Sequence, residues 1–529
     1  MKVLLRNPYP FLPIVLLVAC AGGSSFTEAT VDSGAPGAAD TGSPSTMADA
    51  GSTATDSGPS MDATGRADST APGDSGMVVV DSAAADADAT PPREASGPLS
   101  ATTPAIPCAD TLANVYVTPQ PLAPMNPSLR GDIVRCAPDV SYAVSDVQTQ
   151  ITAKGITTPA TSGASYYRIA YRTMRGNGAA GVSTARVYLP TVPLPLPLPV
   201  IVVGHPTDGL AGTCAPSTDL TSNEDLALPW AALGYVAIVP DYAGLGNDDV
   251  TQGYVDSHDT AYSLLDGARA LRSFLAPGVL SDQVLLSGWS QGGGAVLSAQ
   301  ALAGTYGSGG TLAGVLVFAA EWQTRMNSFG YVDMLNNPTE LTIQTGISYP
   351  EVAILRQYAY DSLYLGASHA ADSFPAAKQS GLSGAITSLC QTPLGGYIQA
   401  TTPHVSDFID DTFRTSLLAC INGGTCVDPG ESFYAYLQQN ILAADPSGPP
   451  MLYVQGLVDY IMPAASEAAC NIAKLQADGV SPQVCVDPLA QHTNVVGRNM
   501  DFALQWGQAV LKGSPLPTCS SAGMPACTP

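Results

Sequence analysis

Short apolar runs alternate with helical patterns along this chain from residue 200 to residue 511. The apolar runs are residues 200–203, 236–240, 284–286, 312–318 and 451–454, and the helical patterns are residues 226–233, 260–275, 292–302, 464–477 and 501–511. Continuous apolar runs are typical of strands that are buried on both faces of a parallel sheet. Parallel neighbours need a crossover connection, which is usually a helix. This order therefore predicts an α/β fold with a mostly parallel central sheet covered by helices.

A hairpin is expected ahead of this alternation. Residues 166–175 and 182–189 are strand-like, and Gly176-Asn177-Gly178 lies between them. Asn-Gly is a strong hairpin signal because both residues tolerate a positive φ. Residues 101–160, which are rich in proline, are expected to be irregular.

The alternation stops between about residues 321 and 445. This block is rich in Tyr, Leu and Ser, contains helical stretches, and lies between two strand-like runs. An insertion between two sheet strands is a common place for a lid over a site. We therefore expect an inserted helical cap in this block.

Residues 21–100 differ in composition from the rest of the chain. They are mostly Ala, Ser, Asp, Thr, Gly and Pro, and Phe26 is their one aromatic residue. Such a segment buries too little apolar surface to offset the entropy lost on ordering, so we expect a disordered tether. The folded part is then residues 101–529, which is long enough for one α/β domain with an insertion.

The first 20 residues have the pattern of an export signal. Lys2 and Arg6 precede an apolar stretch, residues 11–19, that is too short to span a bilayer. Leu17-Val18-Ala19-Cys20 resembles the bacterial lipobox, in which the cysteine is lipidated and begins the mature chain. We expect a lipoprotein-type signal peptide at residues 1–20 and a lipid anchor at Cys20, on the outer membrane or cell surface of a bacterium. The alternative is an ordinary secretory signal and a freely secreted protein.

Ten cysteines remain when Cys20 is set aside. An even number in an exported chain indicates an oxidising compartment and up to five disulfides. The expected pairs are Cys420–Cys426, Cys519–Cys527, Cys470–Cys485 and Cys108–Cys136, which leaves Cys214–Cys390. The sequence alone cannot decide this connectivity. No CxxC pair occurs and histidine is scarce, so no metal site is expected.

Gly288-Trp289-Ser290-Gln291-Gly292 is the strongest chemical motif in the chain. It follows the apolar run 284–286 and opens a helical pattern of small residues. GxSxG between a strand and a helix is typical of a nucleophile elbow, whose tight turn needs neighbours without a Cβ atom. The helix N-terminus also presents N–H groups to a developing oxyanion. We therefore expect Ser290 to be a nucleophile.

A serine nucleophile needs a histidine base, which for this motif comes last in the chain order Ser, acid, His. His492 lies in a loop just before the last helical pattern, where the base is expected. His369 and His404 also follow Ser290, but both fall in the expected cap.

The acid that orients the base is expected after a late strand. Asp459 follows the strand-like run 451–454 and is the predicted acid. Asp445 precedes that run, which places it at the wrong end of the sheet, and Asp487 lies only five residues before His492.

An oxyanion hole needs two N–H donors. We expect one from the backbone of Gln291 and the other from the loop after the run 200–203. Pro206 has no N–H, so Thr207 and Asp208 are the candidates in that loop. His205 is expected to be a structural loop residue.

Several motifs occur in a defined order along the chain. They are residues 205–217, residues 239–246, the Ser290 turn, residues 455–459 and His492. Together, over about residues 160–512, they resemble the secretory lipase family of the Candida lipase A type. The loop reads His-Pro-Thr-Asp where bacterial relatives often have His-Gly-Thr-Thr, and Trp289 is an unusual residue at the elbow.

The resemblance implies an α/β-hydrolase fold, a helical cap over an acyl-binding tunnel, and lipase or carboxylesterase activity. It implies Ser290, Asp459 and His492 as the triad, and it supports Asp208 with Gln291 at the oxyanion hole. It also favours a bridge from Cys214 into the cap, at Cys390. Trp289 and Tyr242 are the expected substrate contacts.

The expected function is therefore a serine ester hydrolase that forms an acyl-enzyme from acyl esters and needs no cofactor. The alternatives are a serine peptidase or amidase on the same fold, and a non-catalytic surface binding protein. The net charge of −24 repels phosphate backbones, so we expect no nucleic-acid partner. A monomer is expected.

Overall fold

The computed structural model describes residues 99–528 except 221–225, 248–250 and 340–348. The expected signal peptide, the lipidation site at Cys20 and nearly all of the expected tether lie outside the described residues. Among the residues that are described, no helix is both long and apolar enough to cross a membrane.

The described strands form one mixed sheet in the order β1-β2-β3-β5-β4-β6-β7-β8-β9. Their bounds are β1 Ile133–Tyr142, β2 Ala164–Met174, β3 Ala180–Pro190, β4 Leu198–Gly204, β5 Val236–Pro240, β6 Leu280–Trp289, β7 Thr311–Phe318, β8 Met451–Gly456 and β9 Gln483–Asp487. All neighbours from β5 to β9 are parallel, and β1, β2 and β3 join them through antiparallel pairs. The predicted α/β fold with a mostly parallel sheet is confirmed.

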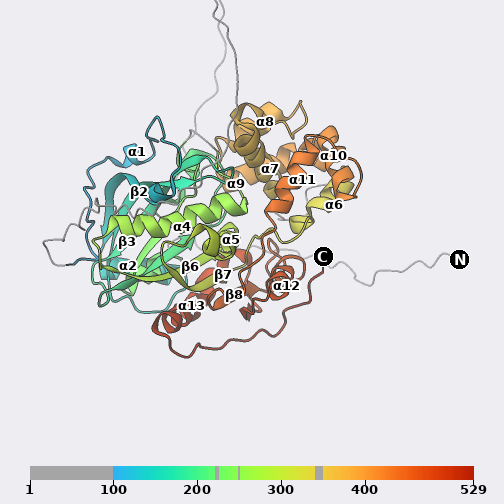
Figure 1. Ribbon diagram of the computed structural model, residues 1–529. Helices are drawn as coiled ribbons and strands as arrows, with labels where there is room; N and C mark the ends of the chain where they lie inside the picture. Colours follow the sequence, from blue (N-terminus) through green and yellow to red (C-terminus); the bar gives the residue numbers. More distant parts are fainter. Residues whose placement is uncertain (1–98, 221–225, 248–250, 340–348, 529) are drawn as a thin grey trace, which may run out of the picture. The chain divides into compact units, whose positions relative to one another are not determined.

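Helices cover both faces of this sheet (Figure 1). Val200 and Val202 of β4 pack in one apolar cluster with α4 (Ser257–Phe274), α5 (Gln291–Tyr306) and α12 (Ala469–Ala477). Ile201 and Val203 pack on the opposite face with α2 (Val144–Ala153), α3 (Leu228–Ala232) and α13 (Val495–Lys512). Successive side chains of a strand point to opposite faces, which explains why the central strands read as continuous apolar runs.

The hairpin is present, and both of its strands begin two residues before the predicted ranges. β2 pairs with β3 in antiparallel register from Ala164↔Pro190 to Met174↔Ala180.

The prediction that residues 101–160 are irregular is wrong, since this region contains α1 (Leu112–Val115), β1 and α2. β1 is an edge strand with irregular register around Pro138. Proline is tolerated at such an edge, where one side of the strand needs no ladder bonds.

The chain between β7 and β8 is helical and includes the block where the cap is expected. The helices are α6 Tyr331–Asn336, α7 Tyr349–Tyr360, α8 Gln379–Ile386, α9 Gln391–Thr401, α10 Asp411–Ile421 and α11 Gly430–Gln439, coloured yellow to orange in Figure 1. They share an apolar cluster of their own, which includes Phe374, Phe413 and Phe433. Leu210 and Tyr254 join the same cluster, so the insertion packs directly on loops of the core.

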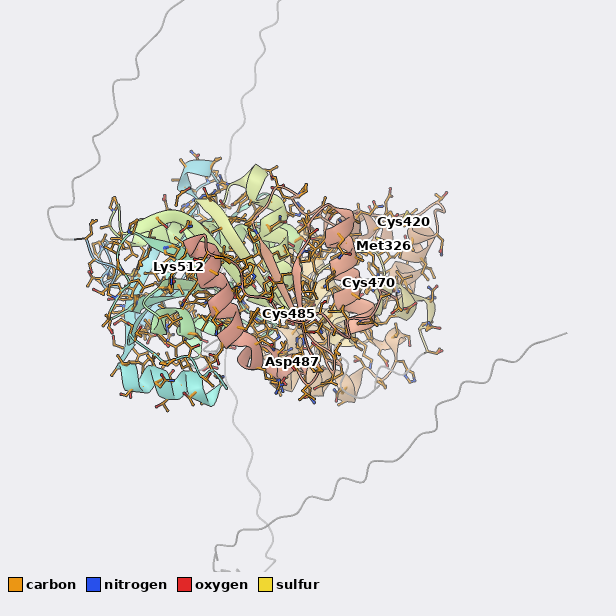
Figure 2. The ribbon with its side chains drawn as sticks, turned by 90° about the horizontal axis from the view of Figure 1, so that it is seen from below. Met326, Cys420, Cys470, Cys485, Asp487 and Lys512 are labelled. Carbon is orange, nitrogen blue, oxygen red and sulfur yellow. A yellow bond between two sulfur atoms is a disulfide. The ribbon has the colours of Figure 1, made fainter. Side chains whose placement is uncertain are left out.

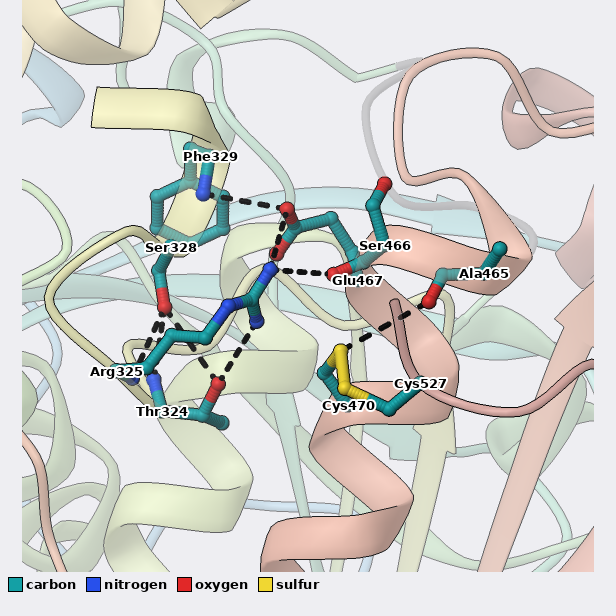
Figure 3. Close-up of a disulfide and its surroundings, with 9 residues drawn as sticks. All are labelled: Thr324, Arg325, Ser328, Phe329, Ala465, Ser466, Glu467, Cys470 and Cys527. Carbon is teal, nitrogen blue, oxygen red and sulfur yellow. Dashed lines mark hydrogen bonds and ion pairs between the residues drawn. A yellow bond between two sulfur atoms is a disulfide. The ribbon is translucent and has the colours of Figure 1, made fainter. Parts of the chain in front are cut away.

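Five disulfides are present among the described residues. Cys108–Cys136, Cys214–Cys390 and Cys420–Cys426 are paired as expected. The expected pairs Cys470–Cys485 and Cys519–Cys527 are wrong: the structure has Cys470–Cys527 and Cys485–Cys519. Cys470 lies on α12 and Cys485 on β9 (Figure 2), and each is bonded to the C-terminal segment instead (Figure 3 shows Cys470–Cys527). That segment runs along β9, where Val486 N donates to Ser520 O over 2.8 Å, so sequence neighbours are not spatial neighbours here.

Candidate active site

Ser290 lies in the tight turn between β6 and α5. Its φ of 56° is positive, which is rare for a residue with a side chain and is found at strained functional turns. A Cβ atom on Gly288 would meet the Gly292 carbonyl oxygen, and one on Gly292 would meet the Gly204 carbonyl oxygen. The motif therefore needs glycine at both places, because three pieces of backbone meet around the serine.

Ser290, His492 and Asp459 form one line of hydrogen bonds. His492 Nε2 lies 2.9 Å from Ser290 Oγ, and His492 Nδ1 lies 2.8 Å from Asp459 Oδ2. An ionised carboxylate can only accept, so Nδ1 donates to Asp459 and leaves Nε2 to accept the serine hydroxyl. All three residues are buried. This arrangement can transfer a proton from the serine to the imidazole and stabilise the resulting cation.

Asp459 is held by the loop that follows β8. Its Oδ1 accepts from the backbone N–H of Ile461 over 2.9 Å and of Met462 over 2.7 Å. The rival acids bond elsewhere: Asp445 accepts from Ser447, and Asp487 pairs with Arg498. Only Asp459 therefore contacts the ring of His492 among these three carboxylates.

The loop after β4 carries the two oxyanion candidates. Thr207 and Asp208 line the same cavity as Ser290, and Gln291 is the first residue of α5, directly after the serine. Among the described residues, neither the Thr207 nor the Asp208 backbone N–H has a hydrogen-bond acceptor. We call residues 204–209 the oxyanion loop.

The oxyanion loop is attached to the helical insertion. The backbone N–H of Gln391, at the start of α9, donates to the Asp208 carbonyl over 2.9 Å. Gly209 forms an isolated β-bridge with Cys390, which is itself disulfide-bonded to Cys214. A displacement of α9 would therefore also displace the oxyanion loop.

His205 is a structural residue, as expected. It is fully buried, and its Nε2 lies 3.2 Å from the Asp241 carbonyl. Its Nδ1 lies 2.6 Å from the Pro206 carbonyl and 3.1 Å from Asp208 Oδ2. Burial favours the neutral imidazole, but the hydrogen bond and charge of Asp208, with a smaller effect of Asp241, outweigh burial and raise the pKa of His205. The Asp208 carboxylate thus lies within ion-pair distance of the His205 ring.

The prediction that Tyr242 contacts the substrate is wrong. Tyr242 is fully buried, its hydroxyl donates to the His205 carbonyl over 3.1 Å, and its ring packs on the His205 ring. It does not line the cavity at Ser290. Trp289 does line that cavity, and its ring centre lies 5.4 Å from that of His492.

The cavity at Ser290 has a volume of about 570 Å³. Its wall combines the oxyanion loop, the nucleophile turn and His492 with residues from other elements. These are Lys154 directly after α2, Gln391 of α9, Ile461 of the loop after β8, Asn494 directly before α13, and Gly497 of α13. The wall is therefore mixed in polarity, with one lysine as its cation. Among the described residues, no group of three or more His, Cys, Asp or Glu side chains could hold a metal ion.

Sequence reasoning missed Glu321, which is buried just behind the nucleophile turn. Its backbone N–H donates to the Ser290 carbonyl over 2.8 Å, and its carboxylate accepts from Tyr254 over 3.0 Å. Glu321 could have been proposed from its position in the sequence, because it follows the apolar run 312–318. In parallel sheets, binding and catalytic sites lie at the carboxyl ends of the strands.

The family model of secretory lipases matches residues 215–322. Among curated proteins, none matches the chain.

Several solved structures share the fold. The closed state of Candida antarctica lipase A has a TM-score of 0.56 at 17% identity, covering 78% of this chain and 90% of that one. The rice cell wall degrading esterase LipA from Xanthomonas oryzae has a TM-score of 0.53 at 20% identity, covering 72% and 97%. A candidate hydrolase from Legionella pneumophila has a TM-score of 0.56 at 17% identity, covering 73% and 100%.

At these identities the structural likeness establishes the fold, and the family model adds the sequence relationship over the segment that contains Ser290. The resemblance inferred from the motifs is thereby confirmed: residues 215–322 are similar in sequence to secretory lipases, and the chain has the fold of these lipase and esterase structures.

Proposed function

We propose that this protein is a serine ester hydrolase, a lipase or carboxylesterase that acts through an acyl-enzyme. The observation that carries the proposal is the continuous line of hydrogen bonds from Ser290 through His492 to Asp459. In this geometry a histidine oriented by a carboxylate can activate a serine for nucleophilic acyl transfer.

In the first half-reaction, Ser290 Oγ attacks the ester carbonyl while His492 Nε2 removes the serine proton. Asp459 keeps the other ring nitrogen protonated and stabilises the imidazolium. The carbonyl oxygen becomes an oxyanion, which the N–H of Gln291 and an N–H of Thr207 or Asp208 stabilise. His492 then gives its proton to the leaving alcohol, and the acyl-enzyme remains.

In the second half-reaction, water attacks the acyl-enzyme. His492 accepts a proton from the water, and the same oxyanion donors stabilise the second tetrahedral intermediate. Return of the proton to Ser290 Oγ releases the carboxylic acid. Every proton transfer in this scheme uses His492, so no metal or organic cofactor takes part in it.

The proposed substrates are uncharged acyl esters, from short-chain esters to acylglycerols. The mixed polarity of the cavity wall suits an ester group with an apolar acyl chain. Trp289, which borders Ser290, is the proposed contact for the substrate.

The test is hydrolysis of nitrophenyl esters of increasing acyl length by the purified protein. Ser290→Ala should lose nearly all turnover, and Asp459→Asn should lower kcat by about 10⁴-fold because the histidine tautomer is no longer fixed. Ser514→Ala is the matched control, since Ser514 is exposed beyond α13. Turnover that survives Ser290→Ala would disprove the proposed nucleophile.

We also propose that the chain is exported and anchored by a lipid on Cys20, on the strength of the lipobox-like residues 17–20. The secretory lipase match and the five disulfides support export. Cys20→Ser should move the protein from the membrane fraction to the soluble fraction of the expressing cell. Unchanged membrane association of that variant would rule out the anchor.

A further inference from the structure

The end of β7 holds the backbone of the nucleophile turn on both sides. Ser290 N donates to the Phe318 carbonyl over 3.0 Å, and Glu321 N donates to the Ser290 carbonyl over 2.8 Å. Between them, Ala319 has a φ of 41° and donates its N–H to the Val454 carbonyl of β8 over 3.0 Å. The turn that follows β7 therefore fixes where Ser290 sits relative to the sheet.

The side chain of Glu321 points from this turn to the oxyanion loop. Its Oε1 lies 3.0 Å from the Tyr254 hydroxyl, and its Oε2 lies 3.4 Å from Thr207 Oγ1. The Thr207 and Tyr254 hydroxyls are themselves 2.9 Å apart. The three side chains close a triangle, and all three are buried.

We propose that Glu321 is a positioning residue for the hydrolytic reaction: it holds the oxyanion loop at a fixed distance from Ser290 through its bonds to Thr207 and Tyr254. This inference rests on the proposed ester hydrolase function. Among the described residues, Glu321 is the one that bonds to the nucleophile turn through its backbone and to the oxyanion loop through its side chain. Oxyanion stabilisation depends on this distance, because the donors must already be in place when charge develops.

The surroundings of Glu321 show that a carboxyl group is costly at this position. Burial raises the pKa of Glu321 to about 7, although Tyr254, Arg356 and Thr207 partly offset the effect. Glu467 and Glu351 are further acids in this region, and Arg356 of α7 is the facing cation. A carboxyl retained in such a place needs hydrogen bonds that offset its desolvation.

An apolar side chain in place of Glu321 would leave the Thr207 and Tyr254 hydroxyls without their shared partner. The oxyanion loop would then be free to move by a fraction of an ångström, which lowers kcat. The Michaelis constant should change little, because the donors act mainly on the transition state. We expect Glu321→Leu to lower kcat by about ten- to a hundredfold with KM within about twofold of wild type.

Glutamine should restore most of this loss. Its amide N–H can donate to Thr207 Oγ1, and its carbonyl can accept from the Tyr254 hydroxyl, so the triangle can still close. Glu321→Gln should therefore keep kcat within about threefold of wild type. If Glu321 only filled space, the leucine variant would keep at least as much kcat as the glutamine variant.

The experiment measures kcat and KM for a short-chain nitrophenyl ester with wild type, Glu321→Leu, Glu321→Gln, Thr207→Val and the double variant Thr207→Val with Glu321→Leu. Thr207→Val keeps the backbone N–H and shape but removes the hydroxyl, so it should reproduce the loss in kcat. The double variant should lose no more than the larger single loss, because both changes break one triangle. Glu431→Gln is the control, since Glu431 is exposed on α11.

Wild-type kcat in folded Glu321→Leu, a change confined to KM, or equal defects in the leucine and glutamine variants would overturn the inference. If Glu321→Leu does not fold, an unchanged kcat in Thr207→Val would overturn the inference instead. Failure of the proposed function has a different signature: wild type and Ser290→Ala would then hydrolyse the ester equally slowly.

Discussion

Arg325 and Glu467 join the start of the helical insertion to the segment that follows the Asp459 loop. Arg325 Nη2 lies 3.5 Å from Glu467 Oε1 and donates to the neighbouring Ser466 carbonyl over 2.6 Å (Figure 3). Glu467 also accepts from the Phe329 backbone N–H over 3.2 Å. The disulfide Cys470–Cys527 lies beside this contact. The insertion is thus attached to the core by a charged pair that is almost completely buried on the Glu467 side.

Arg325→Gln should destabilise the protein, and the loss should grow with pH. Burial raises the pKa of Glu467 to about 7, and Arg325 partly offsets this. At pH 5 Glu467 is protonated in the folded state, so the variant loses mainly the bond to Ser466. At pH 8 a buried carboxylate has lost its cation, and we expect a cost of about 2 kcal/mol in the free energy of unfolding.

Urea unfolding of wild type and Arg325→Gln at pH 5 and pH 8 measures this difference. Arg498→Gln is the control, because the Arg498–Asp487 pair is solvent-exposed on the Arg498 side and should contribute little. An equal loss for Arg325→Gln at both pH values would contradict the assigned role of Glu467.

Glu351→Gln should remove part of the pH dependence of stability. Burial, with a smaller effect of Glu321, raises the pKa of Glu351 to about 8. The folded protein therefore keeps a proton that the unfolded chain releases above its ordinary pKa of 4.5, and stability falls as pH rises from that value to about 8. The slope for one such group is at most about 1.4 kcal/mol per pH unit.

Glutamine has no proton to lose, so Glu351→Gln should gain stability over wild type as the pH rises from 5 to 8. Glu321, Glu467 and Asp361 have pKa values raised in the same direction and keep part of the slope in both proteins. Thermal unfolding across this pH range checks the prediction, with Glu431→Gln as the exposed control. Parallel curves for wild type and Glu351→Gln would show that Glu351 does not titrate in this window.

Gly292→Ala should damage both folding and turnover. A Cβ at this position would meet the backbone of Gly204 and the His205 carbonyl, and neither can move without shifting the oxyanion loop. We expect a loss of about 3 kcal/mol in stability and a strong fall in kcat. Gly384→Ala in α8 is the matched control, because a Cβ there meets nothing within 4 Å and alanine favours a helix. A Gly292→Ala protein as stable and active as Gly384→Ala would refute the close packing at the elbow.

Removing Cys214–Cys390 should cost more than removing Cys420–Cys426. The first disulfide joins residues 176 apart in sequence and the second joins residues 6 apart, so the first restricts the unfolded chain far more. We expect a loss of about 3–5 kcal/mol for the first pair and less for the second. The double variant Cys214→Ala with Cys390→Ala should also lower kcat, because Cys390 contacts the oxyanion loop.

Urea unfolding and ester hydrolysis by the two double variants test this point. The Cys420→Ala with Cys426→Ala protein serves as the control, since its disulfide lies within the insertion. If the two pairs have equal effects on stability and on kcat, the link between α9 and the oxyanion loop has no energetic importance.

The sheet could be predicted in large part from the sequence. β4 to β8 all contain the apolar runs identified there, because a strand buried on both faces is apolar over most of its length. The Ser290 turn was also predictable, since the strand, the glycines and the helix that shape it are adjacent in the chain. β1 was missed because an edge strand with a proline does not have such a run.

His492 and Asp459 could be proposed from chain order, but their contact comes from the tertiary structure. Ser290 and His492 are 202 residues apart, and His492 and Asp459 are 33 apart. Tyr242 was predicted from its motif to contact the substrate, but its side chain is buried in the core. The direction of a side chain depends on packing, which periodicity does not report.

The sequence by itself therefore determined the features that depend on neighbouring residues: the strand runs, the helical faces, the nucleophile turn and the even number of cysteines. Only the tertiary structure decided that Cys470 pairs with Cys527 and that Glu321 meets Thr207. Local patterns reflect the backbone and burial preferences of adjacent residues. Contacts between distant segments depend on where the whole chain places them, and many pairings satisfy the same local patterns equally well.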